Sequence, residues 1–100
     1  MRGEAYISGI GMSEVGVRLT RSPLLLTLDA VKEAIADAGL TLDQIDGVAT
    51  YPGKMQIFLG FSPVGTEELI DALGLHARWH AGCAETTAQL GAIAQAAMAV

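Results

Sequence analysis

The segment of residues 88–100 constrains the fold more than any other part of the chain. Apart from Gln89 and Gln95, it contains only Ala, Gly, Leu, Ile, Met and Val. A helix of this composition has no face that prefers water, and such helices lie inside large proteins or in membranes. The segment is shorter than the roughly 20 apolar residues that a membrane span needs. The sequence therefore predicts a covered central helix and no membrane span.

The residues just before this helix hold the only cysteine of the chain, Cys83. A helix start presents unpaired N–H groups and a positive dipole end, which favour a thiolate or an oxyanion. Cys83 is therefore a candidate nucleophile, and the alternative is a small buried thiol in the core. Glu85 is a candidate base or a favourable first-turn charge, while Thr86 and Thr87 are candidate caps or hydroxyl donors to a substrate. A pair of Cys83 with His80 requires proximity that the spacing alone does not supply.

The charge and the cysteine count exclude several classes of protein. The formal net charge is −5, and the six Lys and Arg residues are scattered, which argues against a nucleic-acid-binding surface. A single cysteine forms no internal disulfide and builds no zinc site by itself, so we expect no metal and a reducing compartment. The first residues carry no secretory signal pattern, and we therefore expect a cytoplasmic protein.

Patterns along the chain alternate between strands and helices. Because the crossovers between the strands are long, the order predicts an α/β fold with a parallel sheet. The expected strands are 5–11, 48–51 and 75–81, and the expected helices are 23–38, 67–73 and 88–100, with a capping-box turn at 41–44.

Local end signals support the helix boundaries. Ser22 followed by Pro23 is a typical N-cap and first helical residue, and Gly39 stands where the same helix should end. In the next helix Thr66 is the expected N-cap and Gly74 the expected stop.

The glycine pair Gly9 and Gly11 follows the first expected strand, as in dinucleotide-binding turns. However, Glu14 occupies the place of the third glycine, and the next helix begins about ten residues too late. A plain turn from strand to loop is therefore favoured over a nucleotide site.

The loop 51–63 is unusually apolar for a connection. Loops of this length with exposed apolar side chains pack on another subunit or line a substrate tunnel, and packing is the favoured interpretation. Its large apolar residues are Met55, Ile57, Phe58, Leu59 and Phe61.

Four segments in order, 5–11, 34–40, 45–50 and 96–100, resemble the N-terminal part of thiolase-superfamily proteins, closest to the sterol-carrier-protein-type, lipid-transfer branch. The resemblance implies that residues 1–100 are the first β-α-β half of a thiolase-like five-layer α/β/α/β/α sandwich. It also implies a homodimer and a chain that continues beyond its apolar end.

The same resemblance implies a site at the start of the last helix. Thiolases of this family place a nucleophilic cysteine there, but matching the helix backwards from 96–100 puts Glu85, Thr86 and Thr87 over that position, with Cys83 a few residues early. It therefore implies an aldolase that cleaves a β-hydroxyacyl-CoA thioester, with a steroid side chain as the expected acyl group. The alternatives are an acetyl-CoA acetyltransferase or 3-ketoacyl-CoA thiolase, and a noncatalytic scaffold subunit.

The resemblance to the aldolase branch also implies which ligands and partners to expect. Coenzyme A enters only as part of the substrate, and no other cofactor is expected. Aldolases of this branch resemble subunits that work with a small partner protein of OB-like fold, which the apolar loop would contact.

Overall fold

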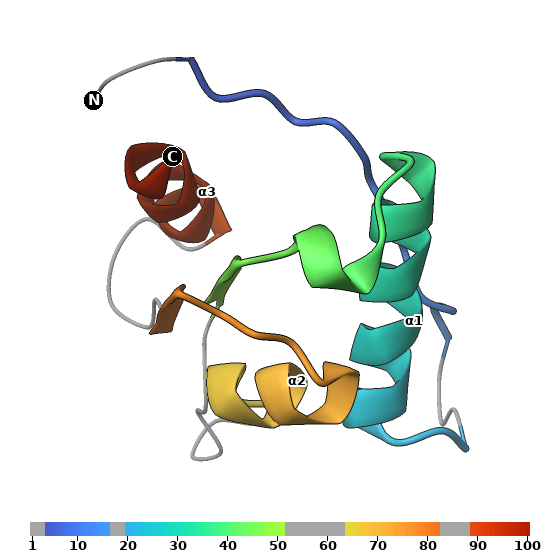
Figure 1. Cartoon of the computed structure of the whole chain (residues 1–100). Helices are drawn as coiled ribbons and strands as arrows, with labels where there is room; N and C mark the ends of the chain where they lie inside the picture. The colour runs from blue at the N-terminus through green and yellow to red at the C-terminus, as the bar shows by residue number, and fades with distance from the viewer. Residues whose placement is uncertain (1–3, 17–19, 52–63, 83–88) are drawn as a thin grey trace.

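The computed structural model describes residues 4–16, 20–51, 64–82 and 89–100. These residues form a mixed α/β structure, which confirms the predicted fold class (Figure 1). Its elements are α1 (Pro23–Asp37), a 3-10 turn (Leu42–Gln44), β1 (Gly47–Thr50), α2 (Thr66–Leu73), β2 (Trp79–Gly82) and α3 (Gln89–Ala99).

The two strands pair in parallel, as the long crossover predicted. Gly47 stands opposite Trp79 at one end of the ladder, and Thr50 stands opposite Gly82 at the other. The sheet lies between α3 on one face and α2 on the other, and α1 packs beside α2 (Figure 1). The described residues thus form three layers, with α3 above the sheet and α2, beside α1, below it in Figure 1.

The core lies on the α2 face of the sheet. Leu69 and Leu73 project from α2 and are 4% and 8% exposed, and Leu75 follows the helix at 9%. Half-buried apolar side chains from α1, β1, α2 and the residue after the 3-10 turn pack around these leucines, namely Leu28, Val31, Ile45, Val48 and Ile70. Since burial of apolar area drives folding, this cluster is the main source of stability in the described part of the chain.

The local end signals of α1 and of the following turn are confirmed. The Ser22 hydroxyl accepts a hydrogen bond from the Leu25 amide at 3.2 Å, and Pro23 is the first helical residue. Gly39 adopts a left-handed φ of 72° after the helix. The Thr41 amide donates to the Gln44 side chain at 2.9 Å, as a capping box requires.

The predicted role of Thr66 as an N-cap is wrong. Gly65 is the N-cap of α2, and Thr66 is the first residue within the helix. The Thr66 hydroxyl instead lies 2.6 Å from the Thr50 hydroxyl. The Thr66 hydroxyl therefore bonds to a residue distant in sequence, Thr50, rather than to the backbone at the start of α2, as the local pattern predicted. The predicted stop at Gly74 is confirmed, with a φ of 65°.

The predicted strand at 5–11 is wrong, because the described residues 4–16 contain no strand. This segment lies along α1 instead. A Cβ on Gly9 would stand 2.7 Å from the Ala38 amide nitrogen, and one on Gly11 would stand 2.6 Å from that of Ala34. The Ile10 amide donates to the Asp37 carboxylate at 3.0 Å. The absence of a side chain at Gly9 and Gly11 thus lets the segment pack closely against α1. Among the described residues, no strand pairs with this segment.

The last strand and the last helix differ from expectation in extent. β2 begins only at Trp79, because Leu75 belongs to the leucine core rather than to the ladder. α3 has nearly the predicted bounds, but it is not covered on all sides in the described residues. Leu90 is 70% and Met98 74% exposed, since the sheet covers one face only. No helix within the described stretches has the length and apolar character that a membrane crossing requires.

Candidate functional site at the carboxyl edge of the sheet

The carboxyl ends of the two parallel strands meet at Thr50 and Gly82, which are partners in the register. In open α/β sheets, ligands bind outside the carboxyl ends of the strands. The predicted segment 83–87 follows β2 directly in sequence. This edge is therefore the candidate functional site.

Two hydroxyl groups meet at this edge. Thr50 ends β1 and Thr66 begins α2, and their Oγ1 atoms are 2.6 Å apart, with either hydroxyl able to donate. Thr66 is 8% exposed, while Thr50 is only half-buried. The pair thus joins a buried hydroxyl to one nearer the surface.

Alternation along the strands assigns side chains to the two faces of the sheet. Val48 packs against the leucine core on the α2 face, so Thr50, two residues later, lies on that face as well. His80 is the register partner of Val48 and is exposed. Thr50 is therefore two residues along the ladder from the register partner of His80.

The predicted site residues Cys83, Glu85, Thr86 and Thr87 lie outside the described residues. Their roles as nucleophile, base or hydroxyl donor therefore stay predictions. The apolar loop proposed to meet a partner lies mostly outside the described residues too, since only its first residue, Tyr51, is among them.

Sequence reasoning missed the pairing of Thr50 and Thr66. Each threonine stands at the end of an element, where a local pattern assigns it to a strand end or to a cap. The signal that would have found the pair is topological, because a helix that crosses back over a parallel sheet starts beside the end of the preceding strand.

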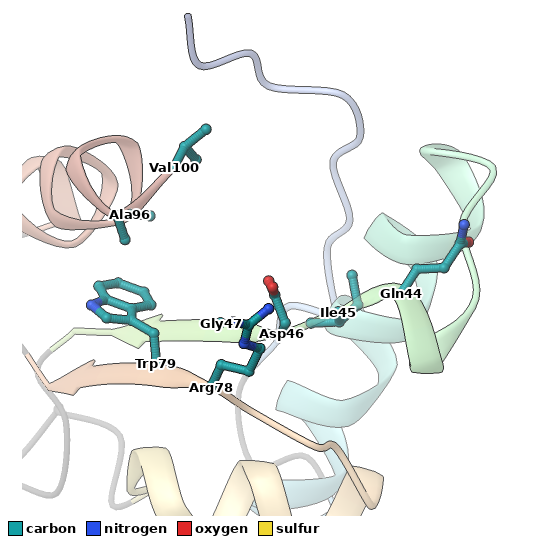
Figure 2. A pocket seen from close by; sticks show the side chains of 9 residues that line it. Gln44, Ile45, Asp46, Gly47, Arg78, Trp79, Ala96 and Val100 are labelled. Atoms are coloured by element: carbon teal, nitrogen blue, oxygen red, sulfur yellow. The ribbon is translucent and has the colours of Figure 1, made fainter. Parts of the chain in front are cut away.

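A hollow of about 690 Å³ lies at the opposite, amino edge of the sheet (Figure 2). It opens between the first residues of both strands and the end of α3. The Trp79 indole lies over Gly47, where an added Cβ would be 2.8 Å from the ring. The hollow is lined by Gln44, Ile45, Asp46, Gly47, Arg78, Trp79, Ala96, Ala99 and Val100.

The described residues that line this hollow offer aromatic, apolar and charged contacts rather than a nucleophile. Its wall combines an indole with one guanidinium and one carboxylate, from Arg78 and Asp46. The Asp46 carbonyl accepts from the amides of Arg78 and Trp79, at 2.7 and 3.2 Å. These bonds fix the start of β2 against β1. Cysteine, histidine, serine and threonine are absent from the described residues that line the wall.

Among the described residues, no three His, Cys, Asp or Glu side chains group as metal ligands. The Asp29 carboxylate is instead engaged by Arg21 in an exposed ion pair.

Two curated proteins resemble part of this chain. One is a 17-hydroxy-3-oxo-4-pregnene-20-carboxyl-CoA lyase from Mycobacterium tuberculosis, 41% identical over 51 residues. The other is a steroid side-chain-cleaving aldolase from Thermomonospora curvata, 47% identical over 49 residues. The similarity covers 51% and 49% of this chain, and 13% and 12% of the two relatives.

The chain therefore spans about an eighth of the length of the relatives that it matches. No family model matches the chain. No solved structure matches it. One relative is thus named as a CoA-thioester lyase and the other as an aldolase, and the similarity to each extends over about half of this chain.

Proposed function

We propose that this chain forms part of a carbon–carbon lyase that cleaves a β-hydroxyacyl-CoA thioester by retro-aldol chemistry, with a steroid as the group that carries the hydroxyl. The observation that carries this proposal is the identity, over about half of the chain, of 41% to a protein named as a pregnene-carboxyl-CoA lyase and of 47% to one named as a steroid side-chain-cleaving aldolase. The thiolase-like five-layer fold, the homodimer and the small OB-like partner belong to the same proposal.

The reaction determines which groups the site must supply. A base removes the proton of the β-hydroxyl, the bond between the α and β carbons breaks, and the hydroxyl carbon becomes a ketone. The electron pair passes to the thioester as an enolate, which a proton then quenches at the α carbon. Donors fixed near the thioester oxygen stabilise the enolate as its charge develops. In this proposal Thr86, Thr87 and nearby backbone amides supply such donors, and Glu85 supports the segment as a base or a first-turn charge.

A direct test uses the full-length protein, together with its partner where one copurifies. The substrate is the thioester named for the mycobacterial relative, 17-hydroxy-3-oxo-4-pregnene-20-carboxyl-CoA. Retro-aldol cleavage between carbons 17 and 20 produces a 17-ketone and propionyl-CoA in equal amounts, which mass spectrometry quantifies. If neither this thioester nor simpler β-hydroxyacyl-CoA thioesters are cleaved, the proposal is wrong.

Substitution of Cys83 separates the lyase from a thiolase. Since retro-aldol cleavage needs no thiolate, Cys83→Ala should leave turnover within about twofold of wild type, whereas loss of a covalent nucleophile costs orders of magnitude. Thr86→Val with Thr87→Val should lower kcat by about 100-fold, the usual effect of removing an oxyanion donor. Abolished turnover in Cys83→Ala, with rapid alkylation of Cys83 in the wild type, would instead establish a thiolase. Intact partner binding without any turnover would leave a scaffold subunit.

A further inference from the structure

The difference in burial between Thr66 and Thr50 favours one direction for the hydrogen bond between their hydroxyls. Thr66 is 8% exposed, and a buried hydroxyl proton without an acceptor is costly. Among the described residues, Thr50 Oγ1 lies 2.6 Å from the Thr66 hydroxyl and can accept this proton. No buried side-chain nitrogen or oxygen among the described residues lacks a partner, which agrees with that arrangement.

If the Thr66 hydroxyl donates to Thr50 Oγ1, the Thr50 hydroxyl proton can form a hydrogen bond with a different acceptor. Thr50 is the less buried of the two and is the last residue of β1, so its hydroxyl is the member of the pair that a ligand at the carboxyl edge can reach. A hydroxyl that already accepts a hydrogen bond is polarised and becomes a better donor. The pair therefore presents one strengthened O–H donor beside Gly82.

We propose that Thr50 donates this hydrogen bond to the carbonyl oxygen of the bound acyl thioester, and that Thr66 is the positioning residue that orients and polarises the Thr50 hydroxyl. The inference rests on the proposed function, because it names a donor for the enolate of that reaction. The Thr50 hydroxyl keeps its proton throughout. Its contribution grows as negative charge develops on the thioester oxygen.

The kinetic test uses the full-length protein and valine substitutions, which keep the shape of threonine and remove the hydroxyl. Thr50→Val should lower kcat about 100-fold, as removal of one oxyanion donor does, and raise KM by up to about tenfold, because the hydrogen bond to the carbonyl of the bound substrate is lost as well. Thr66→Val should lower kcat about tenfold, which corresponds to the loss of one hydrogen bond. The double variant should match Thr50→Val alone, because Thr66 acts only through Thr50.

Controls separate this role from a purely structural one. Thr50→Ser and Thr66→Ser keep the hydroxyls and should retain activity, including the case in which a valine variant fails to fold. Thr27→Val removes a hydroxyl that donates to the Pro23 carbonyl at 2.8 Å on α1, and it should leave kcat unchanged. Equal effects of Thr27→Val and Thr50→Val, or additive effects in the double variant, would overturn the inference.

A binding measurement makes failure of this inference distinguishable from failure of the proposed function. Calorimetry compares propionyl-CoA with its S-propyl thioether, which lacks the carbonyl oxygen. Thr50→Val should weaken propionyl-CoA binding about tenfold, the value of one hydrogen bond, and leave thioether binding unchanged. Wild-type turnover with no effect of Thr50→Val in either assay would refute the hydroxyl donor alone. A carbonyl-specific loss of binding in a protein without lyase activity would support the donor and refute the lyase.

Discussion

The two faces of the sheet are packed by different means. On the α2 face, Leu69 and Leu73 interlock with aliphatic side chains of α1 and β1 and are almost fully buried. On the α3 face the strands present Gly47 and the half-buried Trp79, and Gly91 of α3 is buried. The large side chains of α3 point elsewhere, with Ile93 still 52% exposed.

This contrast shows that hydropathy alone does not decide burial. Both helices are rich in apolar residues, but α2 buries leucines, while the buried and half-buried residues described in α3 are glycine and alanine. Small residues at a contact let the two elements approach closely. The stability of the described residues should therefore depend mostly on the α2 face, and each prediction below tests that difference.

The largest effect is expected from truncation of the leucine core. Leu69→Ala should lower the free energy of unfolding by about 2–5 kcal/mol, since it removes buried methyl groups and leaves a cavity. The matched control is Leu90→Ala on α3, where the side chain is 70% exposed and the change should stay within about 0.5 kcal/mol. Urea denaturation of both variants measures the difference, and equal losses would show that α3 is as well covered as α2.

A smaller effect is expected from enlarging a small residue on the α3 face. Gly47→Ala places a Cβ 2.8 Å from the Trp79 ring, so the indole must move. Overpacking of this kind costs about 1–3 kcal/mol. Combining Gly47→Ala with Trp79→Leu should restore part of the loss in thermal denaturation. Additive losses in the double variant would mean that the indole does not hold this position.

The smallest effect is expected away from both faces. Arg21 and Asp29 form an ion pair whose side chains are 40% and 38% exposed, with a second contact at 3.2 Å. Such pairs contribute about 0.2–1 kcal/mol, and salt screens them. Asp29→Asn should therefore lower the midpoint of urea denaturation slightly at low salt and not at 1 M salt. A large or salt-independent loss would contradict the view that the described stability resides in the α2 face.

Local chemistry explains which features of the fold were predictable from the sequence. Ser22 with Pro23, the Thr41–Gln44 box and Gly74 act on backbone groups within a few residues, so the pattern contains the whole interaction. The parallel pairing of the strands followed from the length of the crossover, which is also readable along the chain.

The features that sequence reasoning missed depend on distant partners. A strand at 5–11 requires an edge to pair with, and α1 supplies a helix surface instead. Thr66 has the right type and position for a cap, but its hydroxyl partner, Thr50, is 16 residues away. The predicted site segment 83–87 lies outside the described residues, so its chemistry is tested by substitution rather than by geometry.

The contact between Ile10 and Asp37 gives the N-terminal segment a reporter. The Ile10 amide donates to a carboxylate on the last residue of α1, so its hydrogen exchanges with solvent only when that bond opens. Deuterium uptake at this single amide therefore measures how often the segment separates from the helix. Loss of the carboxylate in Asp37→Ala, or its protonation at low pH, should accelerate deuterium uptake at the Ile10 amide relative to the amides within α2.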